Sequence, residues 1–491
     1  MLKKLDGFLC PESAYSVFKD ESYSAFLDSG MDEGKLGRFS FICHDPFMVV
    51  RSKGRHLRIE TGNGTVEIQG DPLKTIDEIL AFFKSDERDE DIPFTSGCVG
   101  YFSYDLRYFV ENLPSISIDD LGMPDIVLCF YDIIIIFDNL KREVYISSSG
   151  LPFIDAALRE GRSQIRFEEV LRRLKELEPK EKRDKGLRHS IETDEDNQGI
   201  DSFAISNFSK EEYFDAIEKA KELIARGDIY QVNLSQRFEC EYKQDPYKLY
   251  LVLREINPAP FAAYLNCDDF KIISASPERF VKIIDRYIET RPIKGTRPRG
   301  GSVPEDMDLR DQLIHSPKDR AEHVMIVDLE RNDLGRVCEY GTVRPTEFII
   351  LESYATVHHL VSTIAGRLRP TSGIIQCLKN CFPGGSITGA PKVRAMEVIE
   401  ELEPTKRGIY TGSIGYIDFS GNADLSIVIR TIVINKGRAY FQVGGGIVAD
   451  SIAEKEYNET LDKATALVRA IKIVKDFKAQ QQLTGKIAIS G

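Results

Sequence analysis

The chain has 491 residues, which is too many for one small core and suits two domains or one large compound fold. Hydrophobic residues make up 42% of it and charged residues 29%, the balance of an ordinary soluble globular protein. The net charge of −13 argues against a general nucleic-acid binder, because such proteins neutralise phosphates with Lys and Arg. We therefore expect no nucleic-acid partner, although a local basic pocket could still bind a small anion.

The sequence gives no sign of a membrane or secreted protein. Residues Met1–Cys10 lack the apolar run of a signal peptide, and the longest strongly apolar run, Ile133–Phe137, is far short of a membrane span. Nine cysteines are scattered without a Cys-x-x-Cys pair, and the closest two are Cys377 and Cys381. We expect a reduced, cytoplasmic protein with no membrane partner.

Residues 1–150 form a mixed, sheet-rich N-terminal region. Its apolar runs predict three strands and a helix, over Arg38–Val50, Gly97–Tyr104, Ile126–Phe137 and Pro72–Lys84 respectively. Residues 151–204 follow as a helix and a charged linker. Glu168–Leu177 has a helical pattern, whereas residues 179–199 carry almost no apolar side chains and cannot bury a core.

The main catalytic region is expected over residues 205–472, with a C-terminal tail over 473–491. Ser209 and Glu212 have the spacing of a capping box, which predicts a helix that ends at Gly227. The next residues alternate as in a strand, with Gln231, Asn233, Ser235 and Arg237 on one face. Such a polar face is usually solvated. Several glycine-punctuated polar segments downstream favour a functional role instead, namely Ser276–Arg279, Pro292–Thr296, Ala321–His323, Asp328–Asp333 and Phe382–Lys392.

Two familiar fingerprints do not hold. Gly384–Lys392 resembles a phosphate loop but lacks the Gly-Lys-Ser/Thr ending. Gly444-x-Gly446-x-x-Ala449 resembles a dinucleotide-binding turn, but too little chain follows Ala470 for the further strands of that fold. We expect both segments to form turns or helix starts whose backbone amides hold an anion such as a carboxylate.

Taken in order, these segments resemble the chorismate-utilising enzymes, whose members include anthranilate synthase, isochorismate synthase and aminodeoxychorismate synthase. The resemblance is strong over about residues 205–470 and weak in the N-terminal region. The phrases Pro292–Thr296, Val357–Ser362 and Gly384–Lys392 are most similar to component I of aminodeoxychorismate synthases. The resemblance implies an α+β fold, a large sandwich of two roughly orthogonal antiparallel sheets flanked by helices, with the site in a cleft.

The resemblance also assigns the chemistry at the chorismate C4 hydroxyl. Hydroxide is a poor leaving group, so a general acid is needed, and this role falls to Glu278 with a pKa raised by burial or neighbouring carboxylates. Lys294 would attack C2 as a covalent nucleophile, and ammonia would then displace it to give 4-amino-4-deoxychorismate. Anthranilate synthases typically have a small apolar residue at the position of Lys294. Isochorismate synthases typically have a water-activating lysine at the position of Gln231, which disfavours water addition here.

Further site residues follow from the same resemblance. Glu322 and Glu459 would hold Mg²⁺, with Glu456 close by, because a divalent cation offsets the ring carboxylate of chorismate. Glu456, Glu459 and Lys463 are spaced to share one helix face. The enolpyruvyl carboxylate and the rest of the substrate would be bound by Tyr410, Arg430, Lys463, Thr296, Lys392 and the amides of Gly444, Gly445 and Gly446, beside the active-site histidine His359.

The expected partners are chorismate, ammonia and a separate glutaminase subunit that would supply the ammonia in a heterodimer. Leu27–Gly30 and Asn257–Pro260 resemble the region where relatives hold tryptophan, and whether free tryptophan binds stays open. The expected product belongs to para-aminobenzoate and folate biosynthesis. Two alternatives remain, namely an anthranilate synthase component I and a non-catalytic subunit that binds chorismate or senses tryptophan.

Overall fold

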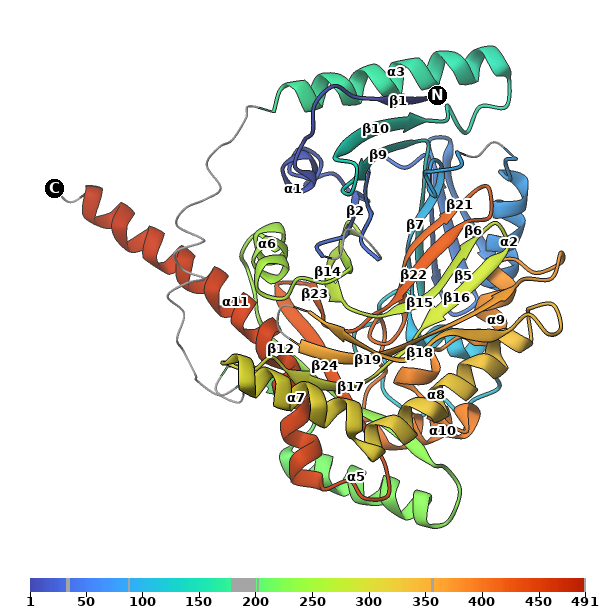
Figure 1. Cartoon of the computed structure of the whole chain (residues 1–491). Helices are drawn as coiled ribbons and strands as arrows, with labels where there is room; N and C mark the ends of the chain where they lie inside the picture. Colours follow the sequence, from blue (N-terminus) through green and yellow to red (C-terminus); the bar gives the residue numbers. More distant parts are fainter. Residues whose placement is uncertain (32–35, 87–88, 178–199, 201–202, 355–356, 490–491) are drawn as a thin grey trace.

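The computed structural model describes the chain except for residues 32–35, 87–88, 178–199, 201–202, 355–356 and 490–491. Two large β-sheets form its centre, and helices lie around them (Figure 1). Within the described residues, no helix is both long and apolar enough to cross a membrane. The charged linker predicted over residues 179–199 lies outside the described residues.

The first sheet combines strands from the N-terminal region with strands that follow residue 204. Among the described residues its strand order is β1 (Leu2–Lys4), β10 (Glu143–Ser148), β9 (Ile133–Asp138), β3 (Phe39–Cys43), β2 (Ala25–Asp28), β13 (Phe261–Asn266), β14 (Phe270–Ser276), β23 (Thr431–Asn435), β24 (Arg438–Ile447), β12 (Gln231–Glu241) and β11 (Ile205–Ser206). The short strand β20 (Gly389–Ala390) also pairs with β12.

The second sheet is built in the same mixed way. Its strand order is β17 (Ile293–Pro298), β19 (Val357–Arg367), β16 (Tyr287–Arg291), β15 (Arg279–Ile284), β22 (Ala423–Ile427), β21 (Ser413–Asp418), β7 (Gly97–Phe102), β8 (Ile126–Tyr131), β4 (Met48–Lys53), β5 (His56–Thr61) and β6 (Gly64–Gln69), and β18 (Arg344–Ser353) also pairs with β19. The strand pairs within both sheets are antiparallel, so the predicted α+β class is confirmed. Because both regions supply strands to each sheet, they form one interleaved unit.

The two sheets enclose a core between them, and strand β9 shows how. Ile134 and Ile136 lie in this inner core together with Val127 of β8. Ile133 and Ile135 point to the other side of the sheet, where they pack with helices. Side chains alternate between the faces of a strand, so an uninterrupted run of isoleucines fits a strand that is buried on both faces. Each such side chain contributes about 1.5–3 kcal/mol by leaving water.

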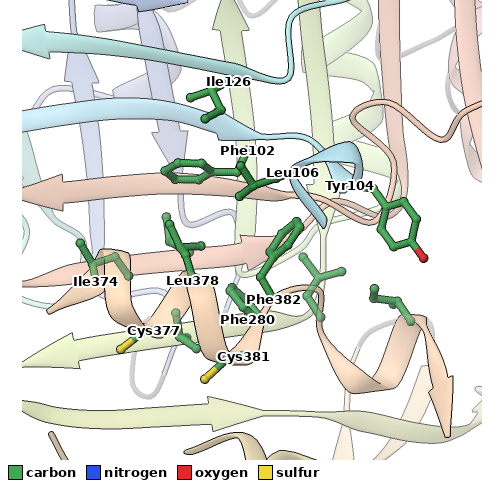
Figure 2. Packing of buried hydrophobic residues seen from close by; sticks show 14 of the residues in the cluster. Phe102, Tyr104, Leu106, Ile126, Phe280, Ile374, Cys377, Leu378, Cys381 and Phe382 are labelled. Atoms are coloured by element: carbon green, nitrogen blue, oxygen red, sulfur yellow. The ribbon is translucent and has the colours of Figure 1, made fainter. Parts of the chain in front are cut away.

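Helices cover the outer face of each sheet (Figure 1). The first sheet packs against α1 (Pro11–Tyr15), α3 (Ala156–Lys175), α6 (Pro246–Ile256) and α11 (Ala453–Ile489). A further apolar core lies apart from the inner core. It includes residues of α2 (Pro72–Phe82), α5 (Lys210–Ala225), α8 (Pro317–Gly335), α9 (Ile374–Cys381) and α10 (Lys392–Leu402). Helix α7 (Val303–His315) precedes α8. Figure 2 shows α9 in this core, with Leu378 near Phe382 and Phe280.

Two predicted strands are each divided between the sheets. The run Ile126–Phe137 forms β8 in the second sheet and β9 in the first, and Arg38–Val50 divides into β3 and β4 in the same way. The chain changes sheet at Asp132, a fully buried carboxylate that accepts a hydrogen bond from Arg162 Nε at 2.7 Å. A continuous apolar run does not reveal such a change, because every position remains buried.

Helix boundaries also differ from the prediction in places. Helix α3 begins at Ala156, well before the predicted pattern, because Asp155 caps it by accepting hydrogen bonds from two backbone amides. The capping box of Ser209 and Glu212 at the start of α5 is confirmed. Helix α11 continues to Ile489, so the boundary predicted between residues 472 and 473 falls inside one helix.

Candidate active site

Glu278 lies where the chain passes from the first sheet to the second. It follows Pro277 between the end of β14 at Ser276 and the start of β15 at Arg279. Its side chain is buried, and the backbone N–H of Ile293 donates to its Oε1 at 3.3 Å. Burial raises the pKa of Glu278 to about 7, against the ordinary value of 4.5. The carboxyl group can therefore hold a proton near neutral pH, as a general acid requires.

The chain returns to the first sheet close by, between β22 and β23, and Arg430 lies at this second crossing. Its φ of 53° is unusual for a residue with a side chain. Two hydrogen bonds tie the crossings together, from Ile427 N to Glu278 O at 3.0 Å and from Ala275 N to Arg430 O at 3.1 Å. An acid and an arginine are thus held at the seam between the sheets.

Lys294 lies on β17, and its ammonium group faces the first sheet across the seam. Its Nζ is 3.6 Å from the position that a Cβ on Gly446 would occupy. Burial lowers the pKa of Lys294, and the carboxylates of Glu322, Glu278 and Glu459 oppose that shift. A lower pKa increases the fraction of neutral amine, the form that acts as a nucleophile.

The backbone at Lys294 is fixed by a relay of hydrogen bonds through His323. Ser362 Oγ accepts a hydrogen bond from Ile349 N at 2.9 Å, so its proton is available to His323 Nε2 at 2.7 Å. His323 Nδ1 then donates to the carbonyl oxygen of Lys294 at 3.3 Å. The Ala321–His323 segment was noticed in the sequence, but no role was predicted for His323, because a contact across 29 residues leaves no local pattern.

Gly444, Gly445 and Gly446 lie inside strand β24 and not in the predicted turn. They pair with Ser235, Leu234 and Asn233 of β12, respectively. A Cβ on Gly446 would lie 2.2 Å from Gln231 Nε2, and one on Gly444 would lie 2.5 Å from Leu234 O. At Gly444 the close approach of the Leu234 backbone, and not turn geometry, therefore requires glycine, whereas a larger residue at 446 would force the Gln231 side chain to move.

One edge of β24 stays open beside these glycines. Strand β23 pairs with β24 only as far as Phe441, and among the described strands no other pairs with β24 on that side. Backbone groups on that edge of the glycine segment can therefore reach a bound molecule. Lys463 Nζ donates to Gly444 O at 2.9 Å, which places an ammonium group at the glycine segment.

The three predicted metal ligands lie around the same segment. Oxygens of both Glu456 and Glu459 are 3.6 Å from the position of a Cβ on Gly445. Burial raises the pKa of Glu322 and of Glu456, and each of these carboxylates is also influenced by a neighbouring glutamate. Burial acts in the same direction on Glu459, but the combined charges of Lys463, Lys294 and Lys318 outweigh it and lower the pKa of Glu459. Lys463 Nζ pairs with Glu459 Oε1 at 2.6 Å.

The donor set suits a hard divalent cation, because Mg²⁺ takes oxygen ligands and commonly uses one or two carboxylates plus water and substrate. Within the part of the chain that the structure describes, no group of three or more His, Cys, Asp and Glu side chains is clustered tightly enough to hold a metal ion. The carboxylates of Glu322, Glu456 and Glu459 match such a cation in donor type only, and a cation held there would need its remaining ligands from water and substrate.

A second group of predicted residues surrounds Arg430. Arg430 Nη1 donates to Lys463 O at 2.9 Å. Burial and the charge of Arg430 lower the pKa of His359 to about 4, so the ring is neutral at pH 7. Thr296 Oγ1 and His359 Nδ1 are 2.8 Å apart. Burial raises the pKa of Tyr410, and the charge of Arg430 opposes that rise.

Lys392 differs from the other predicted residues. Its ammonium pairs with the carboxylate of Asp333 and donates to Cys381 O at 2.8 Å. These contacts join the start of α10 to α8 and α9, a structural arrangement. Lys318 was missed by the sequence reasoning, although it lies one helical turn before Glu322. Its charge influences the carboxylates of Glu322, Glu456 and Glu459.

Comparison with known proteins agrees with this geometry. The chorismate binding enzyme family matches residues 35–469. Aminodeoxychorismate synthase component 1 from Bacillus subtilis is 40% identical, over 90% of this chain and 91% of that protein. Anthranilate synthase component 1 from Aquifex aeolicus is 41% identical, over 95% of this chain and 93% of that protein. The crystal structure of anthranilate synthase component I from Streptococcus pneumoniae has a TM-score of 0.75 and 33% identity, and covers 89% of this chain and 94% of that one.

The fold and these matches define the class of protein: the chain belongs to the chorismate binding enzyme family. It is a chorismate-utilising enzyme of the anthranilate synthase and aminodeoxychorismate synthase type. The two kinds of relative are equally similar in sequence, so the choice between their products depends on the chemistry of the site.

Proposed function

We propose that the chain is component I of an aminodeoxychorismate synthase and makes 4-amino-4-deoxychorismate from chorismate and ammonia. The observation that carries the proposal is Lys294, a lysine with a lowered pKa that faces Gly446 among the carboxylates of the site. An anthranilate synthase needs no nucleophile at this position, because ammonia would attack C2 directly. A desolvated amine there is best explained by covalent catalysis.

The proposed reaction has two displacements. The neutral amine of Lys294 attacks C2, the two conjugated double bonds of the ring shift towards C4, and Glu278 gives its proton to the C4 hydroxyl, which leaves as water. Ammonia then attacks C4, the two ring double bonds shift back to their original places, and the C2–N bond to Lys294 breaks. The new ammonium group gives one proton back to the Glu278 carboxylate. The sum is chorismate plus ammonia giving aminodeoxychorismate plus water.

Binding would depend on the two carboxylates of chorismate. Arg430, Tyr410, Lys463 and the open edge of β24 at Gly444–Gly446 would hold the enolpyruvyl carboxylate. Glu322 and Glu459, with Glu456, would hold Mg²⁺, which when bound offsets the charge of the ring carboxylate and polarises the substrate. Thr296 would fix the neutral ring of His359 beside the substrate. Lys392 takes no part in this arrangement.

Two partners belong to the proposal. A glutaminase subunit would release ammonia from glutamine in a cytoplasmic complex, and the nine free cysteines agree with a reducing compartment. Free tryptophan would occupy a cavity of about 300 Å³. Leu27, Asp28, Ser29 and Pro260 line this cavity, so the two segments that resemble the tryptophan region of relatives lie side by side. Titration with tryptophan, followed calorimetrically, tests this occupancy.

An anthranilate synthase is the second candidate, because relatives with that activity reach 41% identity. Product analysis by chromatography and mass spectrometry decides between the two. The purified chain is given chorismate, Mg²⁺ and an ammonium salt, beside Lys294→Ala and the surface control Lys219→Ala. We expect aminodeoxychorismate without pyruvate release from the wild type and the control, and loss of that product or a change towards anthranilate in Lys294→Ala. Anthranilate plus pyruvate from the wild type would refute the proposal, and no turnover even with a glutaminase would favour a non-catalytic binding subunit.

A further inference from the structure

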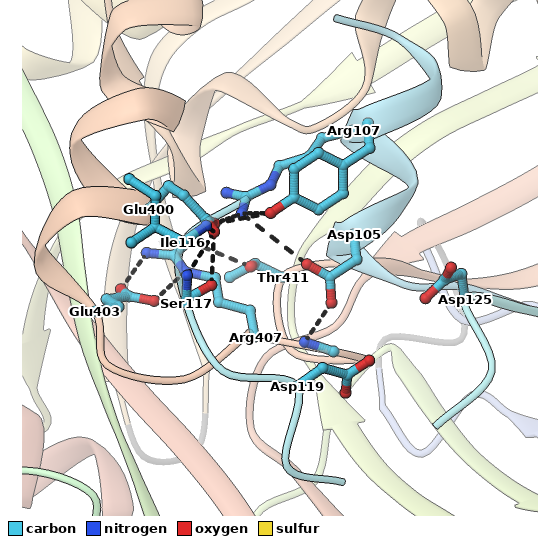
Figure 3. Close-up of polar contacts among 12 residues, drawn as sticks. Asp105, Arg107, Ile116, Ser117, Asp119, Asp125, Glu400, Glu403, Arg407 and Thr411 are labelled. Atoms are coloured by element: carbon cyan, nitrogen blue, oxygen red, sulfur yellow. Dashed lines mark hydrogen bonds and ion pairs between the residues drawn. The ribbon is translucent and has the colours of Figure 1, made fainter. Parts of the chain in front are cut away.

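Two buried arginine–glutamate pairs lie near the C-terminal end of helix α10 (Figure 3). Arg107 pairs with Glu400, and Arg407 pairs with Glu403. All four side chains are at most 4% exposed. Moving such charges out of water has a large free-energy cost, and the hydrogen bonds that each pair makes must offset that cost. The two pairs differ in what those hydrogen bonds reach.

Arg407 distributes its donors over three separate segments. Nε and Nη2 bind the two carboxylate oxygens of Glu403 at 2.9 and 2.7 Å. Nη2 also donates to Asn233 O at 2.6 Å, and Nη1 donates to Ile387 O at 3.2 Å and to Thr411 Oγ1 at 3.3 Å. One planar guanidinium group thus joins β12, the 3₁₀ turn Gly385–Ile387 and the segment after Tyr410.

Each of these contacts lies beside a residue of the proposed carboxylate site. Asn233 is the β12 partner of Gly446. Thr411 follows Tyr410 directly, has a φ of 59°, and its hydroxyl donates to Tyr410 O at 2.6 Å. Arg407 therefore connects both sides of the site, the glycine strand through β12 and the tyrosine through Thr411.

Glu403 extends the same connection along β12. Its Oε1 accepts hydrogen bonds from Ser235 N at 2.9 Å and from Ser235 Oγ at 2.7 Å. Ser235 is the β12 partner of Gly444, and its hydroxyl accepts from Gln442 Nε2 at 2.9 Å. The pair is thereby fixed to β12 opposite both ends of the glycine segment, Gly444 and Gly446.

We propose that Arg407, held by Glu403, is a positioning residue that sets the separation between Tyr410 and the Gly444–Gly446 strand, and so the fit of the enolpyruvyl carboxylate of chorismate. The inference rests on the proposed placement of that carboxylate. Arg407 itself touches no reacting group in this account and acts through Asn233, Ser235 and Thr411.

The pair of Arg107 and Glu400 supplies a matched control. Glu400 Oε1 accepts from Ile116 N at 2.6 Å and from Ser117 N at 2.8 Å, so this pair fixes the loop that follows η1 (Tyr104–Phe109). Arg107 donates to Glu400 and to Tyr108 OH, neither of which belongs to the proposed site. The two pairs are similarly buried, but they differ in how they reach the site. Arg107 approaches it only indirectly, because Asp105, 4.0 Å from its Nη2, accepts a hydrogen bond from Gly408 N at 3.1 Å. Arg407 instead donates directly to Asn233 O and Thr411 Oγ1 beside the site.

The test compares Arg407→Lys with Arg107→Lys. Lysine keeps the charge but loses the planar fork that reaches several acceptors at once. We expect Arg407→Lys to raise the KM for chorismate and its calorimetric Kd about tenfold, with a kcat within a few-fold of wild type and an unchanged KM for ammonium. Both lysine variants should lower the melting temperature by a similar amount. Arg107→Lys, however, should leave the KM for chorismate unchanged. Ser235→Ala is a milder change and should raise the KM for chorismate by a smaller factor. It can replace Arg407→Lys in the test if that variant folds poorly.

Equal effects of the two lysine variants on the KM for chorismate would overturn the inference, as would a fall in kcat alone in Arg407→Lys. KM is measured by chorismate consumption, so it does not depend on which product forms. An unexpected product would therefore refute the proposed function and leave this inference standing. An unchanged Kd in both Arg407→Lys and Ser235→Ala would refute the inference and leave the proposed product intact.

Discussion

Strands β9 and β12 belong to the same sheet and are both buried, yet they are stabilised in different ways. Ile135 of β9 is fully buried among apolar side chains. Gln236 of β12 is equally buried, but it donates to Thr460 Oγ1 at 2.6 Å and accepts from Ser206 Oγ at 2.8 Å. The first strand needs only an apolar neighbourhood, whereas the second needs a specific partner for each polar group.

This difference separates stability from function within one sheet. Every polar partner must be placed correctly, so a buried polar strand restricts the surrounding structure more than an apolar one. In β12 those partners include Glu403 and Arg407, which lie next to the proposed carboxylate site. We therefore expect changes in β9 to affect stability alone, and changes around β12 and the seam to affect catalysis.

The largest expected effect is on the rate, at the seam. Glu278→Gln removes the proton that the C4 hydroxyl needs, so kcat should fall by about 10²- to 10⁴-fold. In the wild type, kcat/KM should decline as the pH rises above about 7, the pKa of Glu278. Steady-state kinetics over pH 5–9, with ammonium in excess, checks both. A variant that keeps more than half of the wild-type kcat would contradict the assignment of the general acid.

Ile135→Ala in β9 should have the largest effect on stability. It leaves a cavity in a fully buried position, so the free energy of unfolding should fall by about 2–5 kcal/mol. Denaturant titration measures this change, and the KM for chorismate of the folded fraction should not change. An altered KM would mean that the apolar strand also shapes the site.

Glu278→Gln should increase stability at alkaline pH, the opposite of its effect on the rate. The folded-state pKa of about 7 lies above the ordinary 4.5, so the native state binds the proton more tightly and wild-type stability falls as the pH rises through this window. Above it the glutamine variant should be about 1–3 kcal/mol more stable, and the gain should vanish below pH 4.5. Thermal unfolding at pH 5 and pH 8 measures the difference, and an equal gain at both would exclude Glu278 titration as its cause.

Gln236→Leu tests β12 itself. Leucine fills a similar volume but leaves the hydroxyls of Thr460 and Ser206 without this partner, so the free energy of unfolding should fall by about 1–3 kcal/mol. Chemical denaturation of Gln236→Leu and Ile135→Ala under the same conditions compares their free energies of unfolding. If the leucine variant were as stable as the wild type, the polar contacts of this strand would not be needed for the fold.

The smallest effect is expected for Thr296→Val. Valine keeps the shape of the side chain but cannot bond to His359, so kcat/KM should fall about fivefold to tenfold, equivalent to about 1 kcal/mol. Kinetics with varied chorismate measures it. Stability should stay within about 0.5 kcal/mol of wild type, because position 296 is exposed.

The class of fold was predicted from the resemblance to a known family, and the alternation and apolar runs agreed with it because they report burial directly. The sequence also predicted a set of site residues, since the motifs around Glu278, Lys294 and Glu322 resemble a known family in order and spacing, and the roles of these residues stay predictions. It did not predict that Ile126–Phe137 would change sheet at Asp132, because burial continues on both sides.

The remaining differences have the same origin. Gly444–Gly446 was predicted as a turn or helix start because its spacing resembles a dinucleotide-binding turn, whereas the closeness of Gln231 and Leu234 across the strand pair favours glycine there. Lys392 was expected at the substrate, and its ion pair with Asp333, 59 residues away in sequence, was not predicted. Contacts that join distant segments leave no local pattern, so they become visible only in the folded chain.

Covalent catalysis by Lys294 is the central claim, and intact-protein mass spectrometry tests it most directly. The chain is mixed with chorismate and Mg²⁺ in the absence of ammonia, quenched in acid, and then digested to locate any modification. The account predicts an added mass of one chorismate less one water on the peptide that carries Lys294, absent from Lys294→Ala and removed when ammonium is added before the quench. Turnover to an aminated product by a wild-type chain that never carries this mass would contradict it.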